Sequence, residues 1–191
     1  MGAKGRLVVF TVWAILINVP LAYLAANHLV PVPSSTNHSL KTFPAAGPEW
    51  KAVHLLAADC GCSLSVARHL QSRGTQDGLA EIVVLIGDAP DLRALLGNTR
   101  FEVQSAEPAG VERDYGVVGG PWLLLFRPDG SLAYSGGYAP VRARDGVVFQ
   151  DVAIWERIRS GQSVAALPAF GCATSEQLRQ ALDPLHLKYT R

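Results

Sequence analysis

The hydrophobic residues of this chain form one long run near the N-terminus and several short runs after it. Residues 7–30 contain no Lys, Arg, Asp or Glu. A helix over these residues would be about 36 Å long, enough to cross the hydrocarbon core of a bilayer with some tilt. A cleaved signal peptide has a shorter apolar region that ends at a small-x-small site, and residues 22–27 offer no clear one. The run therefore predicts a retained transmembrane helix, with a cleaved signal as the alternative.

The charges around this run predict its orientation. Lys4 and Arg6 precede it, whereas Lys41 is the sole basic residue among residues 31–50. The positive-inside rule then keeps the N-terminus in the cytoplasm and places the rest outside, which in a bacterium is the periplasm. We expect residues 1–30 to be a cytoplasmic tip and signal anchor in the inner membrane. Residues 31–49 are rich in Pro and Ser, which is typical of an extended linker.

The remaining residues, 50–191, alternate between strand-like and helix-like patterns. The run 82–86 is continuously apolar and mostly β-branched, as in a strand buried on both faces. The turn sequence at 127–130 lies between two apolar runs and predicts a hairpin. The expected strands are 52–56, 82–86, 101–104, 122–126 and 131–135, and the expected helices are 63–73, 91–97 and 148–160. This order predicts an α/β sandwich with a mixed central sheet.

Composition and charge narrow the class of protein. The 191 residues include 17 Lys and Arg against 16 Asp and Glu, for a net charge of +1. A balance this even gives no reason to expect nucleic acid as a partner. Apolar residues make up 49% and charged residues 17%, which excludes an intrinsically disordered chain. Three cysteines are too few for a disulfide-stapled scaffold.

The candidate chemistry lies at Cys60-Gly61-Cys62, between the first strand and the first helix. A helix N-terminus favours thiolate over thiol, while the neighbouring Asp59 acts in the opposite direction, so the direction of the pKa shift stays open. A Cys-x-Cys disulfide closes a smaller ring than a Cys-x-x-Cys disulfide, and Gly61 is the residue best able to bend through it. A strained disulfide is reduced more easily, so we expect an oxidising pair.

Two other interpretations of these cysteines stay open. The thiols could be inert and buried for packing alone. They could also bind a soft metal, Cu(I) or Zn(II), with Cys172 or a histidine as a third ligand. Redox chemistry is favoured because two cysteines one residue apart begin a helix in a domain that we expect to be exported.

From the cysteine pair onward, the order of motifs resembles a thioredoxin-like domain of the membrane-anchored, periplasmic thiol–disulfide type. The resemblance rests on a strand, a cysteine pair that begins a helix, and residues 115–130, and it extends over about residues 50–160. It implies that Pro121 is cis and lies against the pair, with Gly120 and Pro121 forming the substrate-binding surface. It also implies that Cys60 attacks and that a second thiol resolves.

The sequence departs from this family at the site itself. The family's usual pair is Cys-x-x-Cys, so Ser63 occupies the place of the resolving cysteine, and Cys62 lies one position earlier. Gly120 replaces the commoner Thr or Val. A later Cys172 resembles the third cysteine of a less studied branch. We favour a packing role for Cys172 beneath the C-terminal helix, with a role as a third thiol of the site as the alternative.

The sequence therefore predicts a thiol–disulfide oxidoreductase with Cys60 and Cys62 as catalytic residues. Its partners would be protein thiols or disulfides and a membrane redox donor, and no cofactor is expected. The alternative is a copper-binding or delivery module, with Cu(I) on the same cysteines. The other polar residues carry weaker signals. We expect His54 to be packed or at a sheet edge, His69 to be solvated, and residues 142–145 to form a solvated loop.

Overall fold

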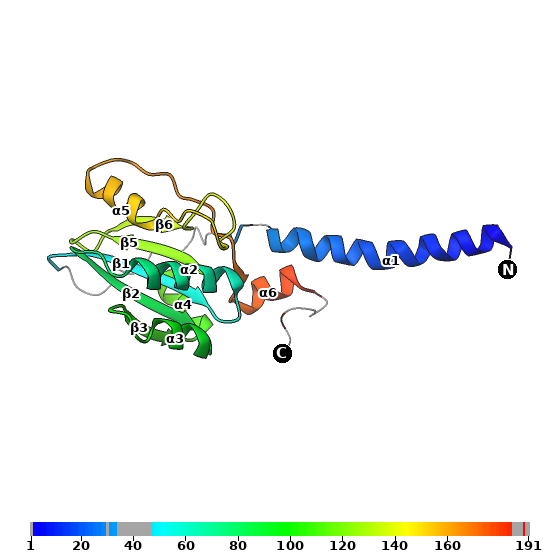
Figure 1. Cartoon of the computed structure of the whole chain (residues 1–191), viewed down its shortest axis with the longest axis horizontal. Helices are drawn as coiled ribbons and strands as arrows, with labels where there is room; N and C mark the ends of the chain where they lie inside the picture. Colours follow the sequence, from blue (N-terminus) through cyan, green and yellow to red (C-terminus); the bar gives the residue numbers. More distant parts are fainter. Residues whose placement is uncertain (1, 30, 34–46, 185–188, 190–191) are drawn as a thin grey trace.

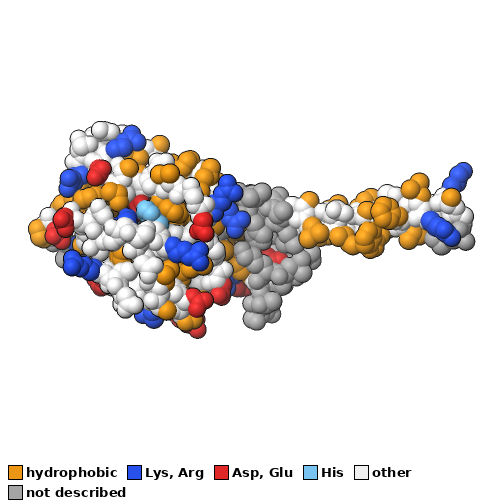
Figure 2. All heavy atoms as spheres, in the orientation of Figure 1, with side chains coloured by type: hydrophobic (Ala, Val, Ile, Leu, Met, Phe, Trp, Pro, Cys, Tyr) orange, Lys and Arg blue, Asp and Glu red, His pale blue; other side chains and the backbone are white. Residues whose placement is uncertain are grey.

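A computed structural model describes residues 2–29, 31–33, 47–184 and 189 of the chain. Helix α1, Ala3–Leu29, projects away from the folded domain. Apolar side chains cover its described part up to residue 22, and basic ones lie at its outer end (Figures 1 and 2). It is the one described helix that is long and apolar enough to cross a membrane. The predicted N-terminal apolar helix is confirmed. The predicted linker falls largely on residues 34–46, which lie outside the described residues.

The domain is built on a five-stranded sheet with the order β3-β2-β1-β5-β6. Strand β1 pairs in parallel with β2, and β2 with β3, whereas β5 is antiparallel to both β1 and β6. The sheet is therefore mixed, and the predicted hairpin is confirmed as β5–β6. The strands are Trp50–Ala57, Leu79–Ile86, Glu102–Ala106, Trp122–Phe126 and Leu132–Gly136 for β1, β2, β3, β5 and β6.

Helices cover both faces of the sheet, as the apolar strand runs require (Figure 1). Alternate residues of β1 face opposite ways, so Ala52 and Leu56 join one apolar core while Val53 and Leu55 join the other. The first core also includes α2, α3 and α5, and the second includes α4. These helices are Gly61–Arg73, Pro90–Leu96, Asp151–Arg159 and Pro108–Tyr115 for α2, α3, α5 and α4.

A second, very small sheet is the part of the fold that positions the chemistry. Strand β4, Gly119–Gly120, pairs antiparallel with β7, Cys172–Ala173. Helix α6, Glu176–Leu182, follows β7 directly, and the Ser175 side chain caps it by accepting a hydrogen bond from the Leu178 N–H at 3.3 Å. The sequence predicted a C-terminal helix but not β4, β7 or α4.

The residues just after α1 are part of the domain core. Val32 is buried, and its N–H donates to the carbonyl of Ala169 at 2.7 Å. Its side chain packs so closely on Gly119 that a Cβ there would lie 2.7 Å from Val32 Cγ1. The end of α1 is therefore held beside the β4–β7 sheet.

Candidate functional site

Cys60 lies at the junction between β1 and α2. Asp59 adopts a left-handed conformation, with φ of 51°, and turns the chain after the strand. Cys60 is then the extended residue that caps α2, and its carbonyl accepts the first helical hydrogen bond from Leu64 N–H at 2.9 Å. The buried Ser63, which occupies the family's resolving position, accepts a hydrogen bond from the Ala57 N–H at 3.0 Å. Ser63 thus ties the first turn of α2 to the end of β1.

Three thiols converge at this junction; all three are buried, and none of them is in a disulfide. The Cys60 thiol donates to the carbonyl of Gly120 at 3.5 Å, and Gly120 is the register partner of Cys172. Side-chain hydrogen bonds join Cys60 to Cys172 and to Cys62. Cys172 is buried, as the packing interpretation expects, but it also contacts Cys60, and its role as a third thiol stays a prediction. The β4–β7 pairing, which sequence distance does not reveal, brings it to Cys60.

The peptide bond between Gly120 and Pro121 is cis, as the family resemblance implies. Gly120 lies against the end of β1, where an added Cβ would be 3.0 Å from the Ala57 nitrogen. On its other side an added Cβ at Gly171 would overlap the Gly120 carbonyl oxygen. A side chain at Gly120 or Gly171 would therefore hold the segments around the thiols apart, which explains why glycine occupies both positions.

The surroundings shift the pKa values of Cys60 and Cys62 in opposite directions. Hydrogen bonds from Cys172 and then Cys62 lower the pKa of Cys60, and the Ser63 N–H at the helix N-terminus acts in the same direction against burial. The hydrogen bond to Cys60 and burial raise the pKa of Cys62, although Arg142 acts against this rise. Because the two groups titrate together, Cys60 loses the first proton and Cys62 retains its own. The direction of the pKa shift, which the sequence left open, is thus downward for Cys60 and favours its thiolate.

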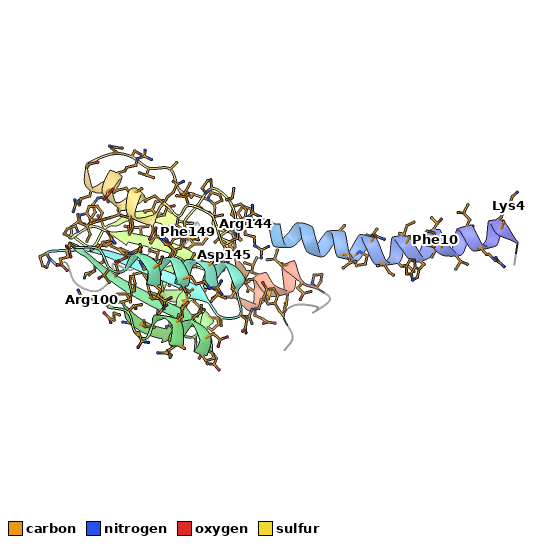
Figure 3. All side chains as sticks on the ribbon, viewed as in Figure 1. Lys4, Phe10, Arg100, Arg144, Asp145 and Phe149 are labelled. Carbon is orange, nitrogen blue, oxygen red and sulfur yellow. The ribbon has the colours of Figure 1, made fainter. Side chains whose placement is uncertain are left out.

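Arg142 is a site residue that the sequence did not reveal. Its Nε donates to Cys62 Sγ at 3.2 Å, and the contact with Cys62 raises the pKa of the guanidinium. Arg142 is exposed, as expected for a solvated loop, but it also contacts a cysteine of the pair. Arg144 and Asp145 of the same loop are exposed, as expected (Figure 3). A lone arginine in a polar loop carries no signal that could distinguish it from its neighbours.

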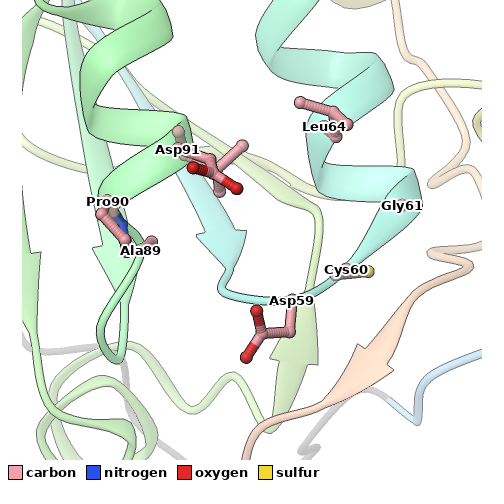
Figure 4. A pocket seen from close by; sticks show the side chains of 8 residues that line it. Asp59, Cys60, Gly61, Leu64, Ala89, Pro90 and Asp91 are labelled. Carbon is pink, nitrogen blue, oxygen red and sulfur yellow. The ribbon is translucent and has the colours of Figure 1, made fainter.

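Cys60 lines an open pocket between the N-termini of α2 and α3 (Figure 4). The pocket has a volume of about 170 Å³, and Leu64, Pro90 and Leu92 give it an apolar wall. Asp59 and Asp91 place carboxylates at the same pocket. Neither Cys62 nor Cys172 lines this pocket. Among the three cysteines, Cys60 is thus the one that lines this opening, although only 4% of its surface is exposed.

A wider pocket of about 480 Å³ lies on the other side of Gly61. Val141, Arg142 and Arg144 line it together with Ser65 from α2. The cysteine motif therefore lies between an opening that carries carboxylates and one that carries guanidinium groups.

A separate group of charged side chains lies buried beneath α2. Arg73 donates to Asp151 through Nε at 2.9 Å and to Glu81 through Nη1 at 3.1 Å. His54 contacts the same Glu81 at 3.2 Å, and His69 contacts Asp151 at 2.9 Å. One cation and two carboxylates, with two imidazoles, thus join β1, β2, α2 and α5 into a single buried network.

The network confirms the expected packing of His54 and shows that the expected solvation of His69 is wrong. His54 is packed, as expected, within the central strand, and its second ring nitrogen contacts the Tyr138 hydroxyl at 2.8 Å. His69 was expected to be solvated, but it is a partner of Asp151. His69 and Arg73 are four residues apart on α2 and share one face of it, a spacing that could have revealed them.

No group of three or more His, Cys, Asp or Glu side chains is arranged as a metal site within the part of the chain that the structure describes. The three thiols come together, but they do so through hydrogen bonds among themselves and with Gly120. Cu(I) on these cysteines stays a prediction from the sequence.

Comparison with known proteins adds to the fold and not to the chemistry. No known protein family matches the chain, and no curated protein matches it. A solved structure of a hypothetical protein from Sinorhizobium meliloti 1021 is 18% identical and has a TM-score of 0.55, covering 68% of this chain and 80% of its own. The thioredoxin domain of a thiol-disulfide oxidoreductase from Bacteroides vulgatus is 14% identical, with a TM-score of 0.42 and coverage of 60% and 79%.

The arrangement of elements bears out the expected fold class. Parallel β1, β2 and β3 adjoin an antiparallel β5–β6 hairpin, a cysteine pair begins α2, and a cis proline precedes β5. The chain thus has a thioredoxin-like α/β fold with a mixed central sheet behind one N-terminal apolar helix.

Proposed function

We propose that this chain is a thiol–disulfide oxidoreductase that acts on partner proteins through Cys60 and Cys62. The observation that carries the proposal is the state of Cys60. It lines an open pocket, caps a helix beside a cis proline, and has a lowered pKa. A thiolate that a partner can reach is the species that attacks a disulfide.

The proposed reaction needs no cofactor. The Cys60 thiolate attacks one sulfur of a partner disulfide, so a mixed disulfide forms and the partner's other sulfur leaves as a thiolate. Cys62 then attacks Cys60, which releases the reduced partner and leaves a Cys60–Cys62 disulfide. Arg142, at 3.2 Å from Cys62, would stabilise the Cys62 thiolate before this step. A membrane redox donor would return the two electrons, and Gly120 and Pro121 would lie against the partner chain.

A redox titration of the full chain in mild detergent tests this proposal. We expect two thiols per chain to become protected from alkylation in one two-electron step, with a potential above the roughly −270 mV of thioredoxin. The lowered pKa of Cys60 stabilises its thiolate and therefore the reduced form of the pair, which makes the pair more oxidising. Mass shift after alkylation reads the result. Three free thiols at every applied potential would contradict the proposal, and a lower potential would contradict the reasoning about the thiolate.

We further propose that α1 anchors the domain outside the cytoplasm and is retained. Two observations support this. Lys4 and Arg6 lie in the first turns of the helix, and Lys4 is at the outer end, opposite the domain (Figure 3). Val32, the third residue after the end of α1, is buried in the domain core beside Gly119. A cut close to the end of the helix would free the segment that packs there.

This arrangement predicts a mature protein that begins at or near Met1. Intact mass spectrometry of the chain from membranes should show the whole apolar helix, and a C-terminal alkaline phosphatase fusion should be active. As a control, the fusion should lose activity when three positive charges are added directly after Val30, since the positive-inside rule then opposes export. A mature N-terminus after residue 22, or labelling of the thiols from the cytoplasmic side alone, would contradict the anchor.

A further inference from the structure

Cys172 is the one thiol of the site that the proposed reaction leaves unused. It is buried, it hydrogen-bonds to Cys60, and it comes from a segment more than a hundred residues further along the chain. A cysteine kept for packing would need no such partner. Cys172 therefore places a third thiol in contact with the thiol that attacks.

The position of Cys172 is fixed from several sides. Its strand pairs with Gly120, whose carbonyl also accepts the Cys60 thiol at 3.5 Å. The next residue, Ala173, donates its N–H to the Tyr189 hydroxyl at 3.0 Å, and its carbonyl accepts from Arg179 Nε at 3.2 Å. Backbone and side-chain contacts thus hold β7, and Cys172 with it, against the cysteine motif.

Cys62 is less well placed to hold a disulfide with Cys60 while α2 is intact. Cys60 is the extended cap and Cys62 lies in the first turn of α2, where it contacts both Cys60 and Arg142. A disulfide between residues this close along the chain closes a small ring through Gly61. A bond from Cys60 to Cys62 must therefore bend the first turn at Gly61. A bond from Cys60 to Cys172 joins two separate segments that already lie in contact, and it leaves the helix as it is.

We propose that Cys172 is a third redox thiol of the site and that it accepts the disulfide from Cys60–Cys62 to give Cys60–Cys172. The Cys172 sulfur attacks the Cys60 sulfur, the bond from Cys60 to Cys62 breaks, and Cys62 leaves as a thiolate. A proton passes from Cys172 to Cys62, so the exchange consumes no oxidant or reductant. The Arg142 guanidinium lies where it stabilises the leaving Cys62 thiolate.

This inference rests on the proposed function and deepens it. The disulfide would be stored between α2 and β7, while Cys62 would become a free thiol beside the pocket that carries Arg142 and Arg144. Oxidation would then also tie the C-terminal segment to the cysteine motif by a covalent bond. The site would hold two disulfide arrangements at the same oxidation level.

Peptide mapping of the oxidised full chain in detergent tests the inference. Trypsin places Cys60 and Cys62 in the peptide 52–68 and Cys172 in the peptide 160–179. After oxidation with excess oxidised glutathione, acid quenching and alkylation, we expect these two peptides to be joined in the wild-type chain. The Cys62→Ser variant should give the same joined pair, with the loss of both remaining free thiols, because Cys60 and Cys172 suffice for it.

The Cys172→Ser and Cys60→Ser variants complete the design. Cys172→Ser should oxidise only within peptide 52–68, and Cys60→Ser should give no joined pair, since Cys62 is held by Arg142 on the other side. Oxidation of the wild type within 52–68 alone would overturn the inference and leave the proposed function intact. No intramolecular disulfide in any variant would overturn both. A joined pair in Cys60→Ser would assign the bond to Cys62 and also overturn the inference.

Discussion

Replacing Arg73 with Met is expected to lower the free energy of unfolding by about 3–5 kcal/mol, the usual cost of removing one partner from a buried ion pair. Arg73 lies between Glu81 and Asp151 and pairs with both, and the side chains of these two carboxylates are nearly inaccessible to solvent. Met preserves much of the apolar packing of the Arg73 side chain. It leaves the buried carboxylates of Glu81 and Asp151 without the positive charge that separates them. Urea titration of the full chain in detergent, followed by tryptophan fluorescence, measures the loss.

A matched control is available on the same helix. Arg68 also belongs to α2 and pairs with Asp145 at 3.6 Å, but both side chains are mostly exposed. An exposed pair of this kind contributes little, so Arg68→Met should change the free energy of unfolding by less than about 0.5 kcal/mol. Equal effects of the two replacements would show that the buried network does not stabilise the fold.

The same network sets the expected response to acid. Burial would raise the pKa of Asp151, but the hydrogen bond from His69 and the charge of Arg73 outweigh it and lower this pKa to about 2. Since the folded-state pKa lies below the ordinary value of 3.8, the stabilisation is present above about pH 4 and is lost as the pH falls toward 2. In Arg73→Met the pKa of Asp151 lies closer to 3.8, so the acid-dependent loss should be smaller and should be complete at a higher pH.

The sequence predicted most of the sheet because its strands carry local patterns. β-branched apolar runs marked β2, and the turn at 127–130 marked the β5–β6 hairpin. Helix α4 was not predicted because it is short, contains Gly110 and buries only Val111, so it shows no helical pattern of apolar residues. Strands β4 and β7 have two residues each, too few for any period.

The chemistry of the site was predictable only in part, for a related reason. A helix start with two cysteines is a local feature, so Cys60 and Cys62 could be found from the sequence alone. The contacts of Cys172 with Cys60 and of Arg142 with Cys62 join segments far apart along the chain. The local sequence around Cys172 looks like that of any packed cysteine, and the local sequence around Arg142 looks like that of any solvated arginine. The pKa of Cys60 depends most on the remote contact with Cys172, so the direction of its shift could not be derived from the sequence.

Replacing Gly171 with Ala is expected to separate β7 from β4 and so to remove Cys172 from Cys60. An ideal Cβ at this position would overlap the Gly120 carbonyl and lie 2.8 Å from Pro121 Cδ, and backbone atoms cannot rotate away as the end of a side chain can. Overpacking of this kind costs about 1–3 kcal/mol. Because the hydrogen bond from Cys172 is the largest cause of the lowered pKa of Cys60, that pKa should rise.

The rate of alkylation by iodoacetamide as a function of pH measures this rise, since the thiolate is the reactive form. In the Gly171→Ala chain the pH at which Cys60 becomes half-reactive should move upward, and urea titration should show the loss of stability. Gly110→Ala is the matched control. Gly110 lies inside α4, and an added Cβ there would be in ordinary contact with the Arg113 side chain at 3.8 Å. Alanine should therefore be neutral or slightly stabilising and should leave the alkylation profile unchanged. An unchanged profile in Gly171→Ala, with undiminished stability, would mean that β7 does not position Cys172 against Cys60, and the three-thiol arrangement would lose its structural basis.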